Sequence, residues 1–127
     1  MHTANYRALV VVDHGSRVDA ANELLERLVD DLRARNDRGY IAVEAAHMEL
    51  ATPSIPDAFA RCVKAGAEHI VVVQFFLSPG RHASEDIPRM VAAAAEACGG
   101  VGWSVSEPIG SDSRLIDLVL ARADATG

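Results

Sequence analysis

Two histidines, His14 and His82, each stand in a short polar loop directly after a run of apolar β-forming residues. The first loop follows the run at 8–12, and the second follows the run at 68–77. Neutral imidazole binds divalent metals and takes up protons near neutral pH. Two imidazoles brought to one edge of a sheet can therefore bind a metal, move protons or do both.

A second pair of candidates, His47 and Glu49, lies at the end of the apolar segment 40–48. Imidazole and carboxylate together suit a borderline divalent metal such as Fe²⁺, Co²⁺, Ni²⁺ or Zn²⁺. Because side chains alternate along a strand, His47 and Glu49 share a face if the strand runs that far. Each also has a structural interpretation, His47 as a hydrogen-bonded strand-end residue and Glu49 as a residue that favours the following helix start.

Groups that can bind an anion accompany both histidines. Ser16 and Arg17 follow the first histidine, and Gly80 and Arg81 precede the second. Gly80 permits close approach of a ligand to the backbone, and the helix start after it can hold an anion. The position of the two arginines favours anion binding over an ordinary surface role. The histidines themselves can also brace turns, and the residues alone leave that choice even.

Hydrophobic periodicity predicts which elements position these residues. Predicted strands cover 8–12, 40–48, 68–77 and 101–106, and predicted helices cover 19–35, 54–66, 84–98 and a last segment capped by Ser111 or Asp112. This regular alternation with short connections indicates an α/β fold with one four-stranded, mainly parallel sheet and helices on both faces. Ligands of such sheets bind beyond the carboxyl ends of the strands, where the polar loops meet.

Composition narrows the class of protein. A chain of 127 residues, half of them hydrophobic, predicts a single domain over 1–127 with its own core. A net charge of −6 argues against non-specific nucleic-acid binding. The absence of a signal peptide and of an apolar run of transmembrane length favours a cytoplasmic protein with no membrane partner. Cys62 and Cys98 lack metal-binding spacing and are expected to be buried reduced thiols.

Three ordered segments resemble the small, class II sirohydrochlorin chelatases. They are His-Gly-Ser-Arg at 14–17, Glu-x-Ala-x-Pro-Ser at 49–54, and Phe-Leu-x-x-Gly-x-His-x-x-x-Asp-Ile-Pro at 76–88. Together they span nearly the whole chain, and the first two are most similar to plant and cyanobacterial ferrochelatases. Plant members carry a C-terminal cysteine pair associated with an iron–sulfur cluster. This chain ends at Gly127 without such a pair, so no cluster is expected.

The resemblance implies insertion of Fe²⁺ or Co²⁺ into sirohydrochlorin, the precursor of sirohaem and cobalamin. The metal, with Ni²⁺ as a further candidate, is then a substrate, and no permanently bound cofactor is expected. His14 and His82 match the family's two active-site histidines, which implies metal binding and uptake of the pyrrole protons. Glu49 matches a third, acidic position that helps to hold the metal or accepts a proton.

The resemblance also implies how the tetrapyrrole is held. Its carboxylates are expected to contact Ser16, Arg17, Gly80 and Arg81, and its ring face to lie on the apolar segment 75–77. The longer members of the family contain two such domains. A single domain is therefore expected to form a symmetric homodimer with the cleft near the interface.

Two other functions stay open. A non-catalytic tetrapyrrole or metal carrier with the same ligands would bind stoichiometrically without turnover. His14 followed by Asn22 faintly resembles the loop of histidine-nucleophile phosphatases, but Asp13 stands where that loop has an arginine, and its carboxylate would repel a phosphate. The ligand types do not choose among the metals or say which histidine takes the proton.

Overall fold

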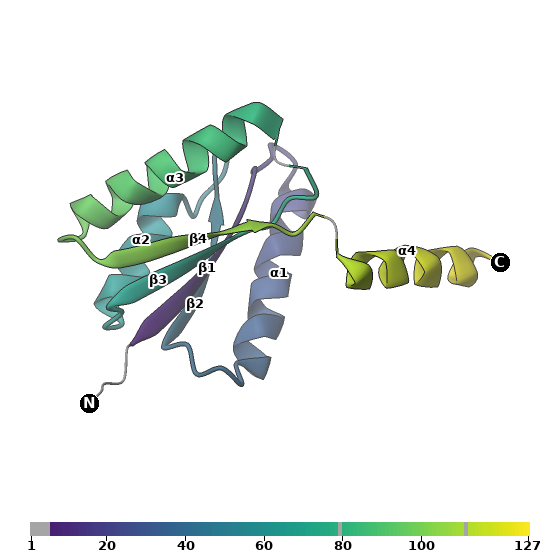
Figure 1. Ribbon diagram of the computed structural model, residues 1–127, viewed down its shortest axis with the longest axis horizontal. Coiled ribbons are helices and arrows are strands. Elements are labelled where there is room, and N and C mark those ends of the chain that lie inside the picture. Colours follow the sequence, from purple (N-terminus) through teal and green to yellow (C-terminus); the bar gives the residue numbers. More distant parts are fainter. Residues whose placement is uncertain (1–5, 79, 111) are drawn as a thin grey trace.

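Four strands alternate with four helices in the computed structural model, which describes residues 6–78, 80–110 and 112–127 apart from the side chains of Arg81 and His82 (Figure 1). In chain order the elements are β1 (Arg7–Asp13), α1 (Asp19–Arg35), β2 (Ala42–His47), α2 (Ile55–Lys64), β3 (His69–Gln74), α3 (Gly80–Ala97), β4 (Gly102–Pro108) and α4 (Ser113–Thr126). The α/β class and the order of elements predicted from the sequence are confirmed.

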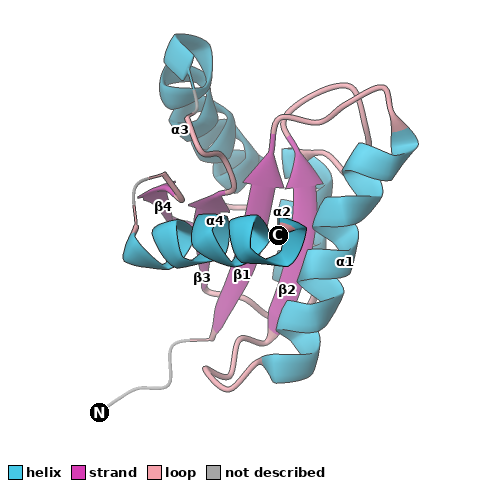
Figure 2. Cartoon of the chain, turned by 90° about the vertical axis from the view of Figure 1, so that its right-hand side faces the viewer, coloured by secondary structure: helices cyan, strands magenta, loops and turns pink. Residues whose placement is uncertain are grey.

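The four strands form one parallel sheet in the order β2-β1-β3-β4. Helix α1 covers one face, and α2 and α3 cover the other (Figure 2). Alternate residues of β1 face the two layers, so Val10 and Val12 pack with α2 and α3 while Val11 packs with α1. Burial on both faces explains why β1 and β3 are almost continuously apolar.

A capping box formed by Ser54 and Asp57 starts α2. The Ser54 hydroxyl accepts from the backbone N–H of Asp57 at 3.2 Å, and the Asp57 carboxylate accepts from the backbone N–H of Ser54 at 3.0 Å. These hydrogen bonds hold the pKa of Asp57 below its usual range. A lowered pKa in the folded state means that this contribution to stability is present at neutral pH and is lost on acidification.

Helix α3 differs from its prediction. It begins at Gly80, four residues before the predicted start, so positions 81 and 82 belong to its first turn and not to a loop. Ala83 in this turn is buried in the core, which extends the helix beyond the local sequence pattern. Pro88 consequently lies inside the helix, whereas the predicted start at 84 would place it in the first turn. Without an N–H it removes one helical hydrogen bond there.

Two strands end earlier than predicted, β2 at His47 and β3 at Gln74. Beyond them the chain keeps single contacts with β1: the N–H of Phe75 still donates to the carbonyl of Val12 at 2.7 Å.

None of the helices in the described part of the chain is long and apolar enough to cross a membrane.

The cysteines are free thiols. Cys62 is fully buried, and burial raises the pKa of its thiol to about 12, whereas Cys98 is half-buried. A thiol reagent should therefore modify the folded Cys98→Ser chain only as fast as it unfolds, because thiolate is the reactive form. Rapid labelling of folded Cys98→Ser would contradict this burial, and Cys62→Ser is the matched control that should still label at Cys98.

Candidate functional site

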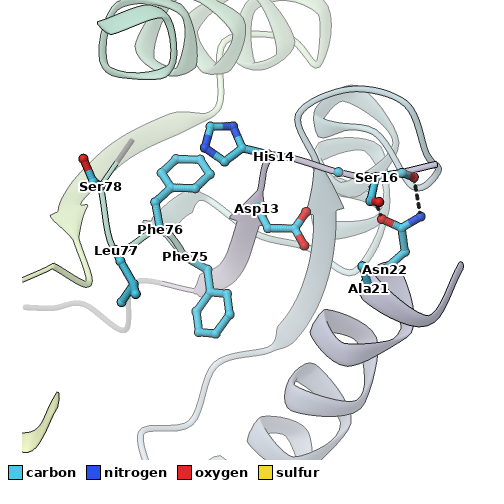
Figure 3. Close-up of a pocket in the computed structure, with 10 residues that line it drawn as sticks. Asp13, His14, Ser16, Ala21, Asn22, Phe75, Phe76, Leu77 and Ser78 are labelled. Carbon is cyan, nitrogen blue, oxygen red and sulfur yellow. Dashed lines mark hydrogen bonds between the residues drawn. The ribbon is translucent and has the colours of Figure 1, made fainter. Parts of the chain in front are cut away.

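A cavity of about 520 Å³ lies at the carboxyl edge of the sheet, where the sequence places the polar loops (Figure 3). The loop after β1 and the segment after β3 line it together with the start of α1; the residues are Asp13, His14, Gly15, Ser16, Ala21, Asn22, Phe75, Phe76, Leu77 and Ser78. Residues more than 50 positions apart in sequence thus share one cavity because parallel strands end at the same edge.

His14 stands at the rim of this cavity, on the sheet face that carries α2 and α3. Its ring is tilted by 36° against that of Phe76, with the ring centroids 4.2 Å apart (Figure 3). Phe76 is buried, whereas His14 is exposed. Within the described part of the chain neither ring nitrogen of His14 has a hydrogen-bond partner. The imidazole is therefore oriented by an aromatic contact and open to a ligand.

Gly15 lets the loop after β1 pack against the loop after β2. The N–H of Glu49 donates to the carbonyl of His14 at 3.1 Å. Gly15 has φ +86°, and a Cβ on it would overlap the backbone oxygen of Glu49. Only glycine combines this left-handed backbone with so close an approach.

Asn22 of α1 fixes the same loop and was not singled out as a site residue from the sequence. Its Oδ1 accepts from the N–H of Ser16 at 2.9 Å, and its Nδ2 donates to the carbonyl of Ser16 at 2.8 Å. The Ser16 hydroxyl accepts from the N–H of Val18 at 2.9 Å, which leaves its own proton free to be donated to a ligand. Asn22 falls on the same face of α1 as the buried Leu25 and Val29, and an amide at such an apolar-face position is the sequence signal that could have identified it.

A second missed feature is a hydrogen bond between Asp13 and His47 beside the cavity. Asp13 and His47 are neighbours in the register of β1 and β2, and Nδ1 of His47 lies 2.7 Å from Oδ1 of Asp13. His47 is 0% exposed. Because β2 ends at His47, the condition for a shared face of His47 and Glu49 is not met. His47 is thus a buried, hydrogen-bonded residue at the end of its strand.

The remaining predicted residues do not belong to the described lining of this cavity. Glu49 is exposed and contacts the loop of His14 through its backbone, outside the set of residues that line the cavity. Arg17 is exposed and lines a neighbouring cavity. Gly80 begins α3 with φ +71°. The side chains of Arg81 and His82 lie outside the described part of the chain, so the meeting of His14 with His82 stays a prediction.

The CbiX family model matches residues 8–126. The chain belongs to the CbiX family. This member is 46% identical over 111 residues to the chloroplastic sirohydrochlorin ferrochelatase of Arabidopsis thaliana, a match that covers 87% of this chain and 48% of that protein. It is 32% identical over 142 residues to the sirohydrochlorin cobaltochelatase of Methanococcus maripaludis, covering 92% and 97%. The chain thus spans about half of the first relative and nearly all of the second.

Solved structures of related proteins share the fold of this chain. The sirohydrochlorin chelatase SirB of Bacillus subtilis subspecies spizizenii, in complex with cobalt, superposes with a TM-score of 0.84 at 34% identity over 94% of this chain and 50% of that one. SirB of Bacillus subtilis with Fe³⁺ gives 0.85 at 33% identity over 95% and 47%. The family and fold expected from the sequence are therefore confirmed.

Proposed function

We propose that this CbiX family chain is a metal chelatase that inserts Fe²⁺ or Co²⁺ into sirohydrochlorin. The observation that carries the proposal is the exposed His14 imidazole held against Phe76 at an open cavity on the carboxyl edge of the sheet. The names of the relatives, sirohydrochlorin ferrochelatase and cobaltochelatase, support this substrate and these metals. A cytoplasmic location accords with the two free cysteines.

The chemistry requires the macrocycle to lose two pyrrole protons as it gains a divalent metal. We assign metal binding and proton uptake to His14 and His82, with Glu49 as the acidic partner that helps to hold the metal or accepts a proton. The open position of His14 lets its imidazole reach the ring nitrogens of a bound tetrapyrrole. Metal is a substrate in this scheme, so the ligand set must release it, which favours few and exchangeable ligands over a closed site.

The cavity walls match a flat ring with charged substituents. Phe76 forms an apolar floor beside His14, and Leu77 at the rim is 66% exposed, so a ring placed there removes apolar surface from water. The peripheral carboxylates would extend toward Ser16 and Arg17 on one side. On the other side they would reach the first turn of α3, which contains Gly80 and Arg81.

A turnover measurement separates a chelatase from a carrier. Sirohydrochlorin and Co²⁺, both in excess over the chain, are incubated anaerobically while the absorption spectrum of the tetrapyrrole is followed. A chelatase forms many equivalents of metallated product per chain, faster than the reaction without protein. One equivalent per chain would identify a carrier, and no acceleration with Fe²⁺, Co²⁺ or Ni²⁺ would refute the proposal.

The phosphatase alternative has little support from the geometry. Asp13 next to His14 is held by His47 and lines the cavity, where its carboxylate repels a phosphate ester. We expect no hydrolysis of p-nitrophenyl phosphate, with or without a metal chelator.

We further propose that α4 pairs two copies of the chain. None of its residues is buried, and it extends away from the sheet (Figure 1). Ile116, Val119 and Leu120 form an apolar stripe on it and are 63%, 61% and 56% exposed.

The length of the relatives supports a second copy as the partner. This chain covers only 48% of the Arabidopsis protein and 46% of the Bacillus subtilis ferrochelatase, which leaves room in each for a second unit of equal size. The chain just after β4, which leads toward α4, contacts the cavity lining, because the N–H of Gly110 donates to the carbonyl of Phe76 at 3.2 Å. A copy seated on α4 would therefore lie beside the cavity rim.

Val119→Asp should convert the dimer into a monomer, because it places a charge in the centre of the apolar stripe. Light scattering coupled to size-exclusion chromatography measures the mass directly. Ala121→Asp adds the same charge to the opposite side of α4 and should remain dimeric. A monomeric wild-type chain, or equal masses for the two variants, would contradict pairing through this stripe.

A further inference from the structure

A second cavity of about 550 Å³ adjoins the one beside His14. Asp19, Glu23 and Glu26 of α1 form one wall, and residues 50–52 form the other. The two cavities share Ser16 and Asn22 in their linings. Three carboxylates on one wall attract cations, but acidic residues on a surface are common, and the wall alone does not make a site.

A histidine behind this wall gives a more specific indication of a binding site. His47 is fully buried, and its Nε2 has no hydrogen-bond partner. This Nε2 lies 3.6 Å from Oε2 of Glu26, which is beyond hydrogen-bond distance. On the other side of the ring, Nδ1 lies 2.7 Å from the Asp13 carboxylate. A carboxylate can only accept, so Nδ1 donates there, and a neutral ring then presents the lone pair of Nε2 to Glu26.

Two acceptors that face each other at this distance repel, and a cation bound between them would turn the repulsion into attraction. Buried polar atoms nearly always have a partner, so an orphaned Nε2 aimed at a carboxylate indicates a missing ligand. A first-row divalent cation fits, since its bonds to imidazole nitrogen and carboxylate oxygen are each about 2.0–2.2 Å long. Asp13 would act as the outer carboxylate that orients a metal-binding histidine and raises its basicity.

We propose that His47 and Glu26 form a binding site for a divalent cation, from which the metal substrate passes to the cavity beside His14. Among the described residues, no three His, Cys, Asp or Glu side chains converge in metal-binding geometry, so water must complete the coordination. Few protein ligands mean weak and exchangeable binding, as a loading site needs. The loading role rests on the proposed function, whereas cation binding itself does not.

The same geometry has one competing interpretation. A doubly protonated His47 would pair with Asp13 and Glu26 at once, and the positive charge would then be the imidazolium itself. In that case no cation binds between His47 and Glu26. Titration with Co²⁺ alone, in the absence of tetrapyrrole, distinguishes the two interpretations.

The titration uses the full chain with His14→Ala and His82→Ala, which removes both histidines of the reaction site. Calorimetry measures affinity, and paramagnetic shifts of imidazole protons in the NMR spectrum identify histidine as a ligand. We expect Co²⁺ binding to persist and to weaken about tenfold or more when Glu26→Gln is added. Glu23→Gln, on the same wall, is the matched control and should change the affinity less than about twofold.

Absence of Co²⁺ binding in the double variant, or equal affinities for Glu26→Gln and Glu23→Gln, would overturn the proposal. The Glu26 side chain is half-exposed, so Glu26→Gln is expected to fold normally. In the insertion assay, Glu26→Gln should raise the Co²⁺ concentration that gives half the maximal rate. If the wild type inserts no metal, the proposed function fails, while the Co²⁺ titration still decides whether the cation site exists.

Discussion

His14→Ala is expected to lower the rate of metal insertion into sirohydrochlorin by about a hundredfold or more, since a positioned acid–base group contributes about 10²–10⁴ to a rate. The imidazole is exposed at the cavity rim and packs against the ring of Phe76. Its removal therefore takes away reactive nitrogens without opening the core. The measurement is the initial rate of the spectral change of sirohydrochlorin with Co²⁺ under anaerobic conditions.

His69→Ala is the matched control for this variant. His69 begins β3 at the opposite edge of the sheet, where its Nε2 lies 3.0 Å from the hydroxyl of Ser104. It should keep nearly the full rate of insertion. Wild-type activity in His14→Ala would refute the role of His14, and an equal loss in both variants would point to folding and not to the site.

Gly15→Ala should have the second large effect, on both stability and activity. The added Cβ overlaps the backbone oxygen of Glu49, and the residue must keep φ at +86°. The left-handed backbone costs about 1–2 kcal/mol, and forced displacement of the loops about 1–3 kcal/mol more. Urea denaturation should show the loss of unfolding free energy, and the insertion rate should fall because His14 is displaced with its loop.

Gly39→Ala separates the two contributions. Gly39 also has a left-handed backbone, φ +71°, but a Cβ there meets nothing within 4 Å. It should lose only the backbone contribution, about 1–2 kcal/mol, and keep its insertion rate. Equal losses for the two variants would show that the contact between Gly15 and Glu49 is not restrictive.

The regular parts of this fold could be predicted because local pattern and tertiary packing agree there. The apolar spacing of 19–35 gives α1 its observed bounds, and Ser54 with Asp57 marks the start of α2. The start of α3 could not be predicted in the same way. Burial of Ala83 extends that helix to Gly80, and nothing in the nearby sequence reports this tertiary contact.

The site was predictable to the extent that it depends on position in the topology. His14 follows a buried strand and therefore reaches the carboxyl edge. The bond between Asp13 and His47 depends on strand register across 34 positions, and the two bonds of Asn22 to Ser16 depend on how α1 approaches the loop. Such contacts set the geometry of the site, but periodicity does not encode them.

Helix α4 shows a different limit of sequence reasoning. Its apolar residues have the spacing of a core-facing helix, yet the structure leaves all of them unburied. The segment after β4 is bound to the end of β3, where the N–H of Ile109 donates to the carbonyl of Gln74 at 3.2 Å, and α4 then leaves the sheet (Figure 1). A pattern that predicts burial does not say whether the covering surface belongs to the same chain.

A crystal structure of the chain with sirohydrochlorin and Co²⁺ is the most direct test of the proposal that this cavity metallates a tetrapyrrole. We expect the ring to lie against Phe76 and Leu77 with its centre facing His14 and its carboxylates near Arg17. A tetrapyrrole bound away from His14, such as in the cavity that Pro108, Ile109 and Leu115 line at the base of α4, would contradict this account.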